Sequence, residues 1–282
     1  MATTTQTIPR RRRRIVGVST KMYFSAARTK SFVNAILSLL ASSGSDSLDD
    51  IDIFIVPDHV TLAGVVCQVE TAAAAGRVER KKVIIGAQDC HSAESGAFTG
   101  AVSPAVLAEV GCGMVELGHA ERRRLFGETD ESVRDKAKAV VRCGMVPLVC
   151  IGEVDGFGGK GKGAEGRVQA AAEEVMVQVR SVLGALPAEA EVVLAYEPVW
   201  AIGAAEPAPV EHVRGVVRRV RESAEVKGRR EGSVRIVYGG SAGPGLFERL
   251  GGDVVDGLFL GRFAHDPEQF YRTVCEVAEG LM

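Results

Sequence analysis

The chain has 282 residues, of which 46% are apolar and 25% are charged, and 34 basic residues nearly balance 36 acidic ones. This composition is ordinary for a folded globular protein and excludes a disordered chain, a collagen-like repeat and a coiled coil. A net charge of −2 gives no electrostatic reason to expect binding to nucleic acid or to a membrane surface. A single α/β barrel commonly fills this length, although two domains of average size would also fit.

The first 14 residues are polar and basic, with arginine at every position from 10 to 14. No apolar segment follows a short charged one, so we expect a disordered tail rather than a secretory signal, with a nuclear or organelle targeting signal as the alternative. No run of about 18 apolar residues predicts a membrane span. Six cysteines without Cys-x-x-Cys spacing favour free thiols in a reducing compartment, and we therefore expect a cytoplasmic protein.

Short apolar, β-branched runs recur along the rest of the chain, each followed by a segment with helical periodicity. The expected strands are residues 15–19, 52–56, 83–86, 114–117, 146–151, 192–196, 234–238 and 257–260, and expected helical segments include 31–40, 132–142, 168–183 and 210–224. Strands that alternate with helices predict parallel pairing through helical crossovers. Eight such units predict a single α/β domain over residues 15–282, a closed (β/α)8 TIM barrel, with a doubly wound open sheet as the alternative.

Three polar residues stand just past expected strands, where reactive groups of a parallel barrel gather. Lys21 follows the first strand, where its cation either binds an anionic group of a substrate or pairs structurally at the rim. His119 begins a helix after the fourth strand, and helix N-terminal amides favour an uncharged ring that can polarise a carbonyl, although a structural histidine fits equally well. Glu197 follows the sixth strand and precedes a proline and an apolar stretch, so we expect this loop to cover the carboxylate and exclude water.

Glycines follow the seventh and eighth strands, in Gly239-Gly240-Ser241 and in Gly261-Arg262. This position is typical of the phosphate site of a barrel, because backbone N–H groups approach a phosphate closely where no Cβ intrudes. The histidines lack the spacing of metal ligands and the serine lacks a Gly-x-Ser-x-Gly context, so we expect no metal, no cofactor and no serine nucleophile.

Together these pieces predict one site with a cation, an uncharged electrophile, a shielded carboxylate, a covering loop and a phosphate anchor. That set is suited to proton abstraction beside the carbonyl of a small phosphorylated sugar. The carboxylate would take a proton from one carbon and return it to the neighbouring one, while the two nitrogen groups stabilise the enediolate oxygen.

Several longer motifs surround these residues: Lys21-Met22, GAFTG at 96–100, LGH at 117–119 followed by ERR at 121–123, CIGE at 150–153, YEPVWAIG at 196–203 and YGGS at 238–241. In combination, over residues 16–279, they resemble the triosephosphate isomerase family. The resemblance implies that Glu197 is the base, His119 the uncharged electrophile and Lys21 an electrostatic clamp, under a lid formed by residues 198–208.

The resemblance also implies how substrate and partner bind. Gly203, Ser241 and Gly261 would donate hydrogen bonds to the phosphate of a small sugar phosphate. The family is usually dimeric, so a homodimer through the loop at residues 96–100 is expected, with Thr99 in contact with the partner near its first strand.

Four departures from the family pattern touch these functions. Ser19 stands where the family usually has asparagine, so contacts to a substrate oxygen and to Thr99 could both change. Arg262 replaces a usual glycine, and its guanidinium either points away or grips the phosphate or a longer substrate. Pro207 stiffens the lid hinge, and Ala101 replaces an acidic residue that would pair with Arg122 across the dimer.

These departures leave three interpretations. The sequence favours a triosephosphate isomerase that interconverts dihydroxyacetone phosphate and glyceraldehyde 3-phosphate. The alternative is an isomerase of a four-carbon tetrulose phosphate on the same scaffold. The third is a barrel that binds phosphate without catalysis, which the joint presence of the lysine, the histidine and the carboxylate disfavours.

Overall fold

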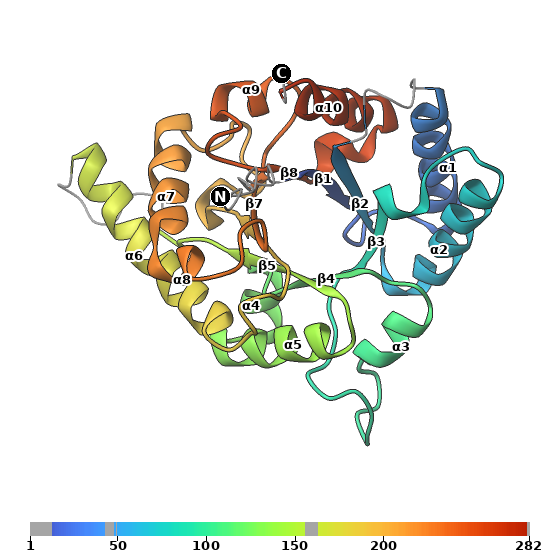
Figure 1. The fold of residues 1–282 in the computed structure, drawn as a ribbon, viewed down its shortest axis with the longest axis horizontal. Helices are drawn as coiled ribbons and strands as arrows, with labels where there is room; N and C mark the ends of the chain where they lie inside the picture. The colour runs from blue at the N-terminus through green and yellow to red at the C-terminus, as the bar shows by residue number, and fades with distance from the viewer. Residues whose placement is uncertain (1–12, 43–47, 49, 156–162, 281–282) are drawn as a thin grey trace, which may run out of the picture.

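The structure of this chain, a computed structural model, describes residues 13–42, 48, 50–155 and 163–280. Eight parallel strands pair in chain order and close into a barrel, with the helices arranged around it (Figure 1). The strands are β1 (Arg14–Ser19), β2 (Ile51–Val56), β3 (Val83–Ala87), β4 (Met114–Leu117), β5 (Val146–Ile151), β6 (Val192–Tyr196), β7 (Val234–Gly240) and β8 (Gly257–Leu260). All eight predicted strands are present, so the prediction of a (β/α)8 barrel is confirmed and the open sheet is wrong.

The helices connect successive strands across the outside of the barrel. They are α1 (Ala26–Ser42), α2 (His59–Ala74), α3 (Pro104–Glu109), α4 (Ala120–Phe126), α5 (Asp130–Arg142), α6 (Ala164–Leu183), α7 (Val210–Glu222), α8 (Ala224–Lys227), α9 (Leu246–Leu250) and α10 (Pro267–Glu279), with 3-10 turns η2 (Arg80–Lys82), η3 (Val199–Ala201) and η4 (Arg262–His265). In the described part of the chain, no helix combines the length and the apolar character that crossing a membrane requires.

Apolar side chains fill two separate layers because successive residues of a strand point to opposite faces. One layer lies inside the barrel and includes Phe54, Met114, Leu148 and Phe259. The other lies between the strands and the helices, where α7 buries a row of valines at helical spacing. The barrel is therefore a packed core that ends in a polar site at one mouth.

The barrel begins one residue earlier than the sequence predicts. Arg14 is the first residue of β1 and is buried, and its guanidinium donates to the backbone oxygens of Gly252 at 2.7 Å and Val255 at 3.0 Å. Arg13 pairs with Asp52 at 2.9 Å. Placing residue 14 in a solvated tail was wrong, because its charge is satisfied by the barrel. Residues 1–12, which hold the rest of the arginine run, lie outside the described residues.

Candidate active site

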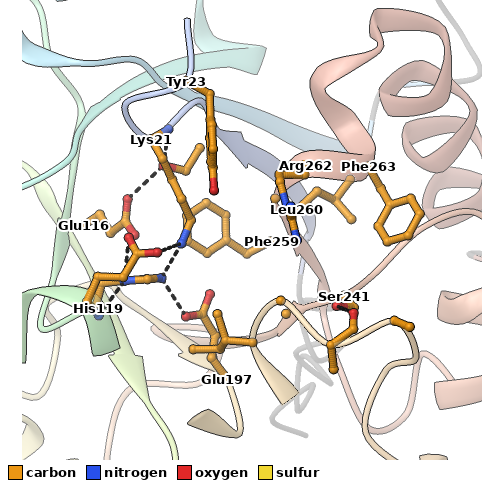
Figure 2. Close-up of a pocket in the computed structure, with 18 residues that line it drawn as sticks. Lys21, Tyr23, Glu116, His119, Glu197, Ser241, Phe259, Leu260, Arg262 and Phe263 are labelled. Atoms are coloured by element: carbon orange, nitrogen blue, oxygen red, sulfur yellow. Dashed lines mark hydrogen bonds and ion pairs between the residues drawn. The ribbon is translucent and has the colours of Figure 1, made fainter. Parts of the chain in front are cut away.

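A cavity of about 500 Å3 opens at the mouth of the barrel where the strands end (Figure 2). Its walls come from β1, β4, β7 and β8 and from the segments that follow these strands and β6, so residues far apart in sequence meet there. The lining includes Ser19, Lys21, Glu116, His119, Glu197, Gly203, Ser241, Gly261 and Arg262. Every residue that the sequence placed in the site therefore lines one cavity.

His119 lies at the junction of β4 and α4, where it caps the helix. Gly118 before it has a φ of 67°, a left-handed conformation that favours glycine. The Nδ1 atom of His119 accepts a hydrogen bond from the backbone N–H of Glu121 at 3.1 Å. Because a ring nitrogen that accepts a hydrogen bond carries no proton, the uncharged ring has its proton on Nε2. This proton points toward the other polar groups of the cavity.

Glu197 directly follows β6 and is only 6% exposed. Its backbone N–H donates to the oxygen of Ile151 at 2.8 Å, and its carboxylate lies against Gly239, where any Cβ would overlap it. Its Oε2 atom lies 3.4 Å from Nε2 of His119 and is buried with no hydrogen-bond partner among the described residues. A buried acceptor without a partner is unusual in a folded protein, and here it faces the space that a substrate would fill.

Lys21 follows β1 and has a φ of 46°, the one positive value at a residue other than glycine in the described chain. Such a backbone is strained and persists only where contacts hold it. Here the side-chain amide of Gln88 donates to the Lys21 oxygen at 2.9 Å. The Nζ atom of Lys21 lies 3.1 Å from Nε2 of His119 and 3.0 Å from Oε1 of Glu121. The strained turn thus places the ammonium group on the side of the cavity that holds His119 and Glu121.

The carboxylates around Lys21 keep it charged. Burial acts to lower the pKa of Lys21, but the negative charge of Glu197 and the hydrogen bond to Glu121 outweigh it and raise the pKa above its ordinary value. The ammonium group of Lys21 and the Nε2 atom of His119 therefore lie side by side, 3.1 Å apart, and a carbonyl oxygen in the cavity can contact both.

Glu116 is a cavity residue that the sequence reasoning missed. It is on β4, is 4% exposed, and accepts a hydrogen bond from Ser19 Oγ at 3.3 Å. Burial, reinforced by the charge of Glu197, raises the pKa of Glu116 to about 7. A signal was available: Glu116 is two residues from Met114 in an apolar strand, so it shares the inward face, and a carboxylic acid inside a barrel needs a partner.

The other side of the cavity is formed largely by backbone and glycine. Gly203 and Gly240 have φ values of 75° and 110°, and both line the cavity with Ser241 and Gly261. The Oγ atom of Ser241 donates to the oxygen of Ala204 at 2.6 Å. Arg262 is exposed at this side, on the side of Ser241 and across from His119 (Figure 2). Its guanidinium points into the cavity rather than away from it, next to Gly203.

The segment at residues 198–208, which the sequence predicts as a lid, is fastened at both ends. At its start, the indole N–H of Trp200 donates to Glu153 at 2.9 Å. At its end, the backbone N–H of Ala208 donates to the hydroxyl of Tyr238 at 3.1 Å. Glu153 is fully buried and also accepts hydrogen bonds from Tyr196 and His212. The start of the segment is therefore held by a buried network of hydrogen bonds.

The barrel and the convergent groups are suited to one class of protein: it is an isomerase that moves a carbonyl group between neighbouring carbons, as aldose–ketose isomerases do. Among the described residues, no group of three or more histidine, cysteine or acidic side chains is placed to hold a metal ion.

Comparison with known proteins narrows this class. Residues 14–277 match the family model described as triosephosphate isomerase. The chain is 43% identical over 263 residues to an L-erythrulose-1-phosphate isomerase of Pectobacterium atrosepticum, covering 92% of this chain and 93% of that protein. It is 36% identical over 264 residues to a triosephosphate isomerase of Streptococcus pyogenes (92% and 96%) and 32% identical over 265 residues to that of Aquifex aeolicus (93% and 98%). The chain belongs to the triosephosphate isomerase family.

Proposed function

We propose that this chain isomerises a four-carbon ketose phosphate of the L-erythrulose 1-phosphate type. The observation that carries the proposal is the 43% identity, across 92% of the chain, to a relative of that name, against 36% and 32% for the two triosephosphate isomerases. The similarity therefore favours the four-carbon tetrulose phosphate isomerase, which was the alternative to a triosephosphate isomerase in the sequence analysis. The departures at Ser19 and Arg262, which both line the cavity, agree with a changed substrate.

The chemistry of such a substrate fits a proton transfer. In a 2-ketose 1-phosphate, the carbonyl at C2 lies between the phosphate-bearing C1 and the hydroxyl-bearing C3. Removal of the C3 proton leaves its electron pair in a C2–C3 double bond, and the carbonyl oxygen becomes an enediolate oxygen. Return of a proton to C2 and transfer of the hydroxyl proton from O3 to O2 give the isomer with the carbonyl at C3. No electron is gained or lost overall.

Three side chains would carry this reaction. Glu197 takes the C3 proton and returns it to C2, since its buried Oε2 atom has an open acceptor position. His119 donates from Nε2 to the developing oxyanion, because Nδ1 is already engaged by Glu121. Lys21 adds a full positive charge at the same oxygen, in a cavity where low solvent access strengthens electrostatic interactions.

The glycine-rich side of the cavity would bind the phosphate. Backbone N–H groups near Gly203, Ser241 and Gly261 are the expected donors, because glycine lets an anion approach the chain closely. Arg262 would add a charged contact there, and an arginine is well suited to phosphate because its planar fork matches two oxygens.

We also propose a homodimer through the loop at residues 96–100. Figure 1 shows the segment between β3 and α3 extending away from the barrel. Phe98 in this segment is half-exposed, and Met22 and Val60, in and beside the loops after β1 and β2, are each 93% exposed. A second copy that packed against this segment and these loops would cover apolar side chains that are otherwise exposed.

The cysteines support a reducing compartment such as the cytoplasm. All six are free thiols in the structure, and burial raises the pKa of Cys90 to about 12 and of Cys112 to about 11, which makes these two thiols unreactive.

A direct comparison of two substrates tests the proposed function. The measurement is kcat/KM for L-erythrulose 1-phosphate and for dihydroxyacetone phosphate, with the products followed by proton NMR. We expect turnover of the four-carbon substrate to exceed that of the three-carbon one. Efficient turnover of dihydroxyacetone phosphate alone would instead establish the triosephosphate isomerase that the sequence favoured.

A further inference from the structure

The inward end of the cavity holds a carboxylic acid that the proton transfer does not use. Glu116 belongs to β4, where Met114 points into the barrel interior and Val115 and Leu117 pack outward against the helices. Alternation along the strand therefore places Glu116 inside the barrel, in the layer next to the cavity. It lines the cavity while being almost fully buried. An acid in this position is costly unless something binds it.

The protein satisfies only half of this carboxyl group. Ser19 Oγ donates to Oε2 at 3.3 Å, and the same Oγ accepts from the backbone N–H of Lys21 at 3.3 Å. The hydrogen-bond partner that the described chain gives to Oε1 is the thiol of Cys150 at 4.0 Å, a weak donor at the limit of contact. Oε1 is thus the part of Glu116 that remains available to a ligand.

The position of Glu116 relative to the phosphate side defines what it can meet. Figure 2 shows Ser241 and Arg262 on one side of the cavity and Glu116 and His119 on the other, with Glu197 between them. A substrate whose phosphate lies beside Arg262 and whose C3 lies beside Glu197 directs its next carbon toward Glu116. In dihydroxyacetone phosphate there is no such carbon, whereas L-erythrulose 1-phosphate carries a hydroxymethyl group there.

We propose that Glu116 is a specificity-determining residue that binds the terminal hydroxyl group of the four-carbon substrate, with Ser19 holding the carboxyl group in place. This inference rests on the proposed function. The small Ser19 side chain leaves room for the extra carbon. A hydroxyl group fits the acid in either protonation state, because it accepts from a carboxylic acid and donates to a carboxylate. In its ionised form the same acid also repels a phosphate, which helps to fix the direction in which the substrate binds.

The test removes the proposed contact between Glu116 and the terminal hydroxyl group, first by changing the substrate and then by changing the protein. The substrate pair is L-erythrulose 1-phosphate and its 4-deoxy analogue, in which a methyl group replaces the terminal hydroxymethyl. The protein pair is the wild type and Glu116→Ala, with Glu116→Gln as a near-isosteric second variant. We expect the wild type to prefer the hydroxylated substrate by about 10- to 100-fold in kcat/KM, and Glu116→Ala to reduce this preference below about threefold. Non-additivity of the two deletions identifies a direct contact.

A matched control uses Glu153, a buried glutamate that does not line the cavity. Glu153→Gln alters a buried acid that anchors the lid outside the cavity, so it should change the rates of both substrates alike and leave their ratio intact. A wild type that does not distinguish the two substrates would overturn the inference without reference to any variant. So would a Glu116→Ala enzyme that keeps the full preference. A wild type that is inactive on L-erythrulose 1-phosphate but active on dihydroxyacetone phosphate would instead contradict the proposed function itself. This outcome differs from the other two, which contradict only the role of Glu116.

Discussion

The two sides of the cavity are built in different ways. The side with Glu197, His119 and Lys21 consists of buried side chains, each fixed by a backbone contact or by a strained turn. The side with Ser241 and Arg262 consists of glycine-rich backbone and one exposed arginine. In the proposed reaction the first side must hold reacting atoms within a fraction of an ångström, whereas the second only has to bind an anion. Substitutions on the first side should therefore affect kcat, and those on the second should affect KM.

The largest expected effect comes from shortening the base. Glu197→Asp withdraws the carboxylate by one methylene from the carbon-bound proton, and a misplacement of about 1 Å costs roughly 100-fold in rate. We expect kcat to fall by about 100-fold or more while KM changes little, as measured by steady-state kinetics. Glu189→Asp makes the same change at an exposed position before β6 and serves as the control. A Glu197→Asp enzyme with near-normal kcat would remove Glu197 from the role of base.

A smaller effect is expected when the support of the base is disturbed. Gly239→Ala places a Cβ where the Glu197 carboxylate lies, so the carboxylate must move and kcat should fall by about 10- to 100-fold. Gly64→Ala is the matched control, because a Cβ at Gly64 in α2 meets no atom within 4 Å. It should leave kcat unchanged and stabilise the helix by about 0.5–1 kcal/mol. Equal kinetics of the two alanine variants would show that Gly239 does not position the base.

The arginine on the opposite side should act through binding. Arg262→Gly removes a charged contact to phosphate, and we expect KM to rise by about tenfold for three- and four-carbon substrates alike, with kcat nearly unchanged. The ratio of kcat/KM for the two substrates should stay constant, because Arg262 lies beside Ser241, on the side of the cavity that we propose binds phosphate (Figure 2). Arg262→Lys keeps the charge and should lose less. A changed ratio would show that Arg262 senses substrate length, the other role that the sequence left open.

The difference between the two sides also explains how far the sequence could be interpreted. The strands were predictable because apolar runs alternate with helical segments, and the parallel barrel then places the residues after every strand at one mouth. That topology alone put Lys21, His119 and Glu197 in one cavity. The role of Glu116 was not predictable in the same way. A single acid within a strand can be assigned to the inside or the outside of the barrel only when it is known which alternate residues of that strand point inward. The direction of the Arg262 side chain depends on packing and is not encoded in any local pattern.

The smallest expected effect is a pH dependence of stability that reports on Glu116. The pKa of this residue is raised from 4.5 to about 7 in the folded protein. Between these values the unfolded chain releases a proton that the folded chain retains, so the free energy of unfolding falls as pH rises. Below about pH 4.5 both the folded and the unfolded protein hold the proton, so Glu116 causes no loss of stability. Above about pH 7 both have released it, and the loss of stability has reached its full size.

Glu116→Gln replaces the ionisable carboxyl group with an amide, so the fall in the free energy of unfolding that Glu116 causes with rising pH should disappear. From pH 6 to pH 8, the free energy of unfolding of the variant should gain about 1 kcal/mol relative to the wild type, a relative rise in Tm of about 2–4 °C. Thermal unfolding of both proteins at several pH values provides the measurement. Parallel curves across this range would mean that Glu116 is ionised throughout, and the terminal hydroxyl would then act only as a donor to it. A gap that widens with pH would show instead that the acid at the inward end carries a proton near neutrality, so that it can either donate to the substrate or accept from it.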